Sequence, residues 1–202
     1  MHISDGVLSA PVWVSGYIVS AAIVAATTKK IQAEDIPKIA IMTSAFFVAS
    51  LIHIPIGPTS IHLILSGLVG MILGPAAFVS ILLGLALQAL LFQHGGITTI
   101  GVNSLMMGLP ALLVYRIFNL HRMFRFKLNV AIFGALTGGC GIFTGTLILV
   151  LLLITTGSEF IGVAKLALLA HLPVMVIEAV TAGFIVSFLK TVKPELLERR
   201  KK

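Results

Sequence analysis

Histidine is the metal-binding side chain that this sequence offers most often. Six histidines occur, against one cysteine and seven acidic residues: His2, His53, His62, His94, His121 and His171. Imidazole nitrogen is the commonest nitrogen ligand for transition metals in proteins. The histidine content therefore favours transition-metal binding as the chemistry of this chain.

The first two residues, Met1 and His2, form a chelating group by themselves. The large side chain of His2 disfavours removal of Met1, so we expect a free amine there. This amine, the His2 backbone nitrogen and the His2 Nδ1 close a five-membered and a six-membered ring around one ion. One further imidazole completes a square-planar site of four nitrogens, which is typical of Ni(II) or Cu(II) and accessible to Co(II). The alternative is that a histidine at this position has no metal role.

Other polar residues have several interpretations. Asp5 either orients the tail or an imidazole, caps a helix, or is solvated. His171 and Glu178 are seven residues apart and share a helix face. An acid inside a membrane is costly and indicates function, although the two also suit a polar packing pair. His53 suits an interfacial residue, and His121, among basic residues, suits a solvated loop.

The composition indicates a membrane protein. Of 202 residues, 58% are hydrophobic and only 10% are charged, whereas a soluble domain has about 25% charged residues. These values exclude a cytosolic enzyme, a disordered chain and a coiled coil. We expect one all-α domain over residues 1–202. No basic residue precedes the first apolar segment, so we expect no cleaved signal peptide and a mature protein that begins at Met1.

Apolar stretches near the bilayer-crossing length of about 20 residues predict seven spans. They are Pro11–Thr28, Ile39–His53, Ile61–Leu73, Ala76–Gln93, Ile100–Tyr115, Leu128–Thr156 and Phe160–Leu189. The second and third are short and flank a segment broken by Pro and Gly at 53–62. Such a segment at membrane depth is buried in protein or lines a cavity; an ordinary surface loop is the alternative.

The basic residues predict the orientation. Thirteen of the 14 fall in three segments on one side: Lys29, Lys30, Lys38, Arg116, Arg122, Arg125, Lys127, Lys190, Lys193, Arg199, Arg200, Lys201 and Lys202. The positive-inside rule then puts the N-terminus outside and the C-terminus in the cytoplasm of a cell membrane. On this topology every histidine except His121 lies at the outer face or in the outer half.

Three motifs resemble a known family. They are Met-His-Ile-Ser-Asp-Gly-Val-Leu-Ser at the N-terminus, Gly57-Pro-Thr-Ser-Ile-His62-Leu, and Gln88-Ala-Leu-Leu-Phe-Gln-His94-Gly-Gly-Ile-Thr-Thr-Ile-Gly-Val-Asn103. Together they resemble the CbiM/NikM family, the substrate-specific (S) components of energy-coupling-factor (ECF) importers for cobalt and nickel. The resemblance covers essentially the whole chain.

The resemblance implies a fold and a ligand set. The family has seven transmembrane helices, with the N-terminal loop inserted into the bundle from outside. The implied ligands are the Met1 amine, the His2 amide and imidazole nitrogens, and the His62 imidazole. His94 then has a ligand or transit role or shapes its loop. Asn103 belongs to the second shell of groups that support the ligands.

The resemblance also implies partners. A transmembrane coupling (T) protein, two ATPase subunits and a small auxiliary membrane subunit assemble with S components, which supply metal for processes such as cobalamin biosynthesis. The sequence has no G-x-x-x-x-G-K-[ST] loop, so ATP hydrolysis is expected on separate subunits. We expect no enzymatic activity, no prosthetic group and no nucleic acid, with Co(II) or Ni(II) as transported ligand. The alternative function is a gradient-driven secondary metal transporter that uses His171 and Glu178.

Overall fold

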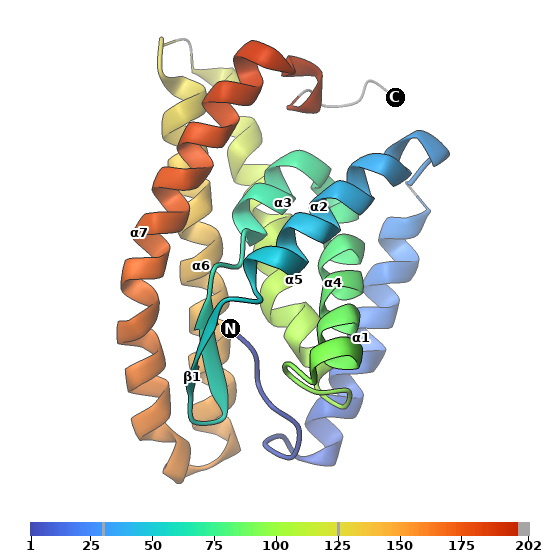
Figure 1. Cartoon of the computed structure of the whole chain (residues 1–202), viewed down its shortest axis with the longest axis vertical. Helices are drawn as coiled ribbons and strands as arrows, with labels where there is room; N and C mark the ends of the chain where they lie inside the picture. The colour runs from blue at the N-terminus through green and yellow to red at the C-terminus, as the bar shows by residue number, and fades with distance from the viewer. Residues whose placement is uncertain (30, 125, 198–202) are drawn as a thin grey trace.

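The computed structural model of the protein describes residues 1–29, 31–124 and 126–197 (Figure 1). This part of the chain contains seven α-helices and two short strands. The helices are α1 (Ala10–Thr28), α2 (Ile36–Ala49), α3 (Ser66–Leu73), α4 (Ala77–Phe92), α5 (Ile100–Phe118), α6 (Asn129–Thr156) and α7 (Ile161–Val192). The strands are β1 (His53–Ile56) and β2 (Thr59–His62).

Five helical segments of the described chain are long and apolar enough to cross a membrane. They are Ala10–Thr28, Ser66–Phe92, Ile100–Met123, Asn129–Thr156 and Ser158–Val192. The mostly helical fold that the hydropathy predicts is therefore present. The prediction of seven spans is not confirmed, because α2 has 14 residues and α3 only 8, against about 20 for a full crossing.

The expected helices around residues 53–62 are wrong at their boundaries. We predicted spans at Ile39–His53 and Ile61–Leu73, but α2 ends at Ala49 and α3 begins at Ser66. The residues between them form an antiparallel hairpin, which an all-α prediction omits. Gly57 has a φ of +53° and Pro58 a ring-fixed negative φ, which together suit the two-residue turn of a tight hairpin. Strand β2 is largely buried and β1 largely exposed.

Helix α5 lies at the centre of the bundle, where it packs against α1, α3, α4 and α6. Helix α7 packs along the length of α6 (Figure 1). The hairpin and the N-terminal residues lie between the pair α6 and α7 and the other helices (Figure 1). The helices therefore enclose the N-terminal residues and β2, whereas β1 is largely exposed.

The three basic segments meet at one end of the molecule, here called the basic end. Lys38 donates to the carbonyl of Leu196 and Arg122 to that of Leu197, at 3.2 and 2.9 Å. The hairpin turn and the 93–99 loop lie at the opposite end (Figure 1), here called the hairpin end. Lys30, Arg125, Arg199, Arg200, Lys201 and Lys202 lie outside the described residues.

The N-terminal tail runs into the bundle and pairs with the hairpin. Ile3 forms an antiparallel bridge with Thr59, and the Ser4 N–H donates to the Pro58 carbonyl at 3.1 Å. The side chain of Ile3 is fully buried. The tail thus lies beside β2 like a short third strand, with its first two residues at the centre of the fold.

Candidate metal centre

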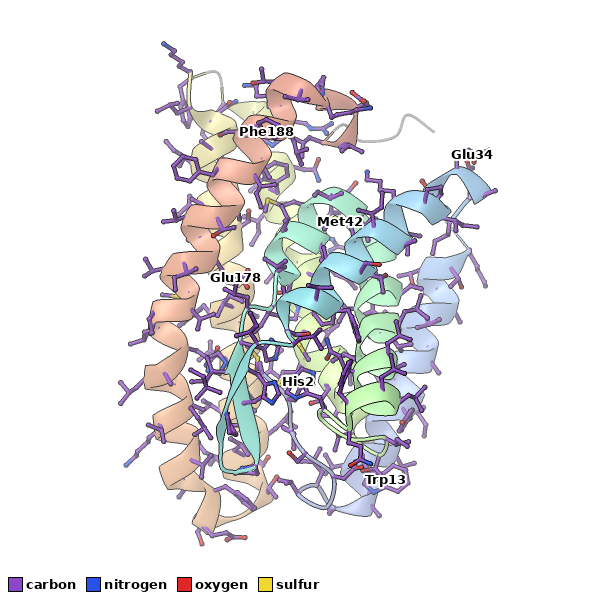
Figure 2. All side chains as sticks on the ribbon, in the orientation of Figure 1. His2, Trp13, Glu34, Met42, Glu178 and Phe188 are labelled. Atoms are coloured by element: carbon purple, nitrogen blue, oxygen red, sulfur yellow. The ribbon has the colours of Figure 1, made fainter. Side chains whose placement is uncertain are left out.

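Three nitrogen atoms from two distant segments meet inside the bundle. The Met1 amine contacts the Nε2 atom of His62, and the His2 Nδ1 lies 2.9 Å from the same Nε2. Met1, His2 and His62 have 1%, 2% and 4% of their surfaces exposed. Figure 2 shows His2 inside the bundle beside the hairpin, with Glu178 nearer the basic end. The fold therefore brings together the donors that the sequence predicts as metal ligands.

Hydrogen bonds fix which nitrogen of His2 is protonated. The Ser50 hydroxyl donates to the Phe47 carbonyl at 2.8 Å and so accepts from the side-chain NH₂ of Gln88. The Gln88 oxygen then faces the His2 Nε2 at 2.7 Å. An amide oxygen only accepts, so Nε2 is the protonated nitrogen of His2. Its Nδ1 is left with a free lone pair, which points at the site.

The tautomer of His62 follows from the same rule. Its Nδ1 lies 2.7 Å from the carbonyl of Leu63, so Nδ1 donates a proton and Nε2 holds the lone pair. Two imidazole lone pairs thus face each other 2.9 Å apart. The Met1 amine, which contacts the same Nε2 atom of His62, supplies an N–H that satisfies this lone pair in the metal-free protein. The geometry suits a metal ion held by neutral imidazoles, the form in which histidine binds metals.

The N-terminal amine has the electrostatics of a ligand as well. Burial lowers the pKa of the Met1 amine well below its ordinary value, which favours the neutral amine. Burial is also the largest cause that lowers the pKa of His2. Among the described residues, the backbone nitrogen of His2 makes no hydrogen bond, whereas the next two N–H groups along the chain do. That nitrogen is therefore free to act as a third donor of the tail.

His94 is the third imidazole of the cluster. One nitrogen from each of His2, His62 and His94 lies within 4.8 Å of the others. The ring of His94 stands 4.1 Å from that of His2 and 5.6 Å from that of His62, measured between centroids. Burial and then the neighbouring His53 lower the pKa of His94 to about 4, so its ring is neutral at pH 7.

Asn103 and Asp5 both form hydrogen bonds that hold the tail in place. Asn103 accepts from the Ile3 N–H at 2.9 Å and donates to the Ile3 carbonyl at 3.1 Å. Asp5 accepts from the backbone N–H groups of Ile97 and Thr98, at 3.1 and 3.0 Å. Asn103 therefore holds the residue next to the chelate. Asp5 fixes the tail to the loop before α5 rather than orienting an imidazole.

Glu178 and His171 lie on α7 but bond to backbone instead of to each other. Glu178 accepts from the N–H groups of Ile64 and Leu65, at 2.5 and 2.7 Å. His171 Nδ1 donates to the Ala167 carbonyl at 2.7 Å. Glu178 thus stabilises the corner between β2 and α3, on the side of the site nearer the basic end (Figure 2). This contact matches the packing interpretation of the pair and lends no support to a proton relay.

Gln88 is the functional residue whose role the sequence interpretation missed. It belongs to the motif that carries the family resemblance, yet its contact with His2 is not evident from spacing. A useful indication was available, since Gln88 is the only strongly polar residue between Ser80 and Gln93 in an otherwise apolar stretch. A buried side-chain amide in such a helix requires hydrogen-bond partners.

The comparison with known proteins now decides the family. The CbiM family model, described as "Cobalt uptake substrate-specific transmembrane region", matches residues 2–196. The chain belongs to the CbiM family. With five membrane-capable helices, this CbiM-family chain is a multi-pass membrane protein.

Individual relatives agree with this assignment. A putative metal transport protein of Haemophilus influenzae is 32% identical over 203 residues, with 98% of both chains covered. A putative fused nickel transport protein NikMN of Archaeoglobus fulgidus is 29% identical over 215 residues, covering 99% of this chain and 69% of the relative. The crystal structure of a truncated transition metal transporter superposes with a TM-score of 0.78 at 27% identity, covering 95% of this CbiM-family chain and 99% of the other.

Proposed function

We propose that this protein captures Co(II) or Ni(II) as the substrate-binding subunit of an ATP-driven, ECF-type importer. The ion is held by four nitrogens: the Met1 amine, the His2 backbone nitrogen, the His2 Nδ1 and the His62 Nε2. The two fixed tautomers support this proposal most directly, because they leave lone pairs of His2 and His62 facing each other 2.9 Å apart. Softness and geometry of the donors suit Ni(II) and Co(II).

The distribution of charge supports transport into the cytoplasm. The basic end faces the cytoplasm under the positive-inside rule, so the hairpin end faces outward and the tail enters from outside. The ion is released inward when the subunit reorients against a coupling protein driven by two ATPases. Release requires an inward state with lower affinity, which withdrawal of the tail provides.

The proposed importer needs further subunits. The NikMN relative is a fused protein and extends beyond the region shared with this chain. This supports association with an auxiliary membrane component in the same complex. The T protein and the ATPases complete the proposed assembly.

Calorimetric titration of the purified protein with Ni(II) and with Co(II) tests the proposed site. The comparison uses the native N-terminus, a form with one extra residue before Met1, the His62→Ala variant and, as a matched control, His121→Ala at the basic end. We expect one tightly bound ion per native chain, unchanged binding by the control, and loss of this tight binding in the other two forms. Thermal unfolding of each variant verifies that the fold is retained. Equal binding by the extended and native forms would refute the amine ligand.

A further inference from the structure

The imidazole cluster continues past the proposed site toward the surface. The ring centroid of His53 lies 4.1 Å from that of His94, which lies 4.1 Å from that of His2. His53 is exposed, His94 is half-buried and His2 is buried. The three rings thus form a graded series from the surface to the interior.

The hairpin register places the outermost ring. His53 and His62 are Cα partners across β1 and β2, and directly opposed residues project from the same face of a sheet. His53 therefore lies on the face that His62 turns to the site. A shift of one residue would move His53 to the other face and break the series.

The outer rings have nitrogens available for an ion. The His53 Nδ1 lies 3.1 Å from the Leu51 carbonyl, so it donates and its Nε2 holds a lone pair. The His94 Nε2 lies 3.4 Å from the Ser60 hydroxyl, and its Nδ1 makes no hydrogen bond within the described chain. Both rings are thus held loosely enough to offer a nitrogen.

We propose that His53 and His94 form an outer binding position for a divalent transition metal, which receives the ion and transfers it to the buried nitrogen site. The ion is first held by His53 and His94. It then passes to His2 and His62, with His94 as the imidazole next to both positions. The ligands are neutral imidazoles at both positions, so no redox or covalent step is involved. This inference rests on the proposed function.

Stopped-flow mixing with Ni(II) separates a transfer role from a ligand role. The proteins are the full-length wild type, His94→Gln, His53→Gln and the control His121→Gln. We expect His94→Gln to slow the association rate at least about tenfold, the lower end of losses seen for groups that support a metal site. Dissociation slows by the same factor, because the ion leaves by the path it enters, so Kd stays constant. His53→Gln slows both rates less, and the control changes neither.

Three results would overturn the inference. Unchanged association in His94→Gln removes the transfer role. A weaker Kd with a faster dissociation rate makes His94 a ligand of the buried ion instead. If His94→Gln does not fold, the exposed His53→Gln variant decides, and an unchanged association rate there overturns the pair. Failure of the wild type to bind Ni(II) refutes the proposed function itself, a distinct outcome.

A direct test for the outer position uses the protein with one residue added before Met1, which removes the buried chelate. This form should retain weak, saturable Ni(II) binding, and His94→Gln in the same background should abolish it. Absence of saturable binding in the extended form contradicts a binding position at His53 and His94.

Discussion

Replacing Gln88 with methionine should weaken Ni(II) binding about 10- to 100-fold, the range found when a partner of a metal-bound histidine is removed. Gln88→Met keeps the length of the side chain but removes the oxygen that accepts from the His2 Nε2, now at 2.7 Å. The His2 ring is 2% exposed, so the orphaned N–H finds no water.

The magnitude follows from the cost of that orphaned group. An unpaired buried donor costs about 1–3 kcal/mol, which is about one to two orders of magnitude in a binding constant. The metal-free protein avoids this cost by moving the His2 proton to Nδ1. Metal binding needs the lone pair of Nδ1, so it returns the proton to the unpaired Nε2 at that cost, and the affinity falls.

Calorimetric Ni(II) titration in detergent measures the effect. The control is Gln93→Met, the same exchange at the exposed end of the same helix, which should bind like the wild type. Thermal unfolding without metal should change little in either variant. Wild-type affinity in Gln88→Met would refute the assignment of the His2 tautomer and with it the inward lone pair.

Further changes test the tail and its ligands. Burial lowers the pKa of the Met1 amine, which eases binding through that amine. Binding through the His2 backbone nitrogen displaces the amide proton, so Ni(II) affinity should rise at least about tenfold per pH unit. A flat calorimetric profile would exclude the amide as a ligand. A Cβ at Gly145 meets the backbone oxygen of Met106 at 3.0 Å and the Met1 Sδ at 3.2 Å, so Gly145→Val overpacks both the contact between α5 and α6 and the tail. Overpacking costs about 1–3 kcal/mol, so both the melting temperature and the Ni(II) affinity should fall. Gly162→Val, in open space, is the control and should change neither. Asn103→Leu leaves both backbone groups of Ile3 without side-chain partners. Each unpaired group costs about 1–3 kcal/mol, so amide hydrogen exchange of the tail should become about tenfold faster or more. Unchanged exchange would mean that Asn103 does not hold the tail.

Hydropathy predicted the long helices well because their burial in lipid depends on composition alone. The hairpin was missed because its apolar residues extend the apolar runs of α2 and α3. Gly57-Pro58 between two short runs is itself a hairpin indication, but span length dominated the interpretation. In a membrane protein, a strand pair is tolerated only where helices enclose it, and that enclosure is not visible in local sequence.

Part of the candidate metal centre could be predicted from the sequence and part could not. The chelate of Met1 and His2 depends on adjacent atoms and follows from the sequence alone. Its meeting with His62, 61 positions from Met1, depends on the fold and entered only through family resemblance. The position of Gln88 against His2 needs the packing of α4 on the tail, so spacing offers no route to it.

The pairing of the tail with β2 makes metal affinity a property of the docked state. Ile3 and Ser4 pair with the hairpin through one bridge and one further backbone hydrogen bond, and Asn103 and Asp5 add side-chain hydrogen bonds. If part of the chains have an undocked tail, the measured Kd is the intrinsic constant divided by the docked fraction. A substitution at Thr59 or Pro58, which supply no donor atom, therefore tunes how much ion the protein collects at a given concentration.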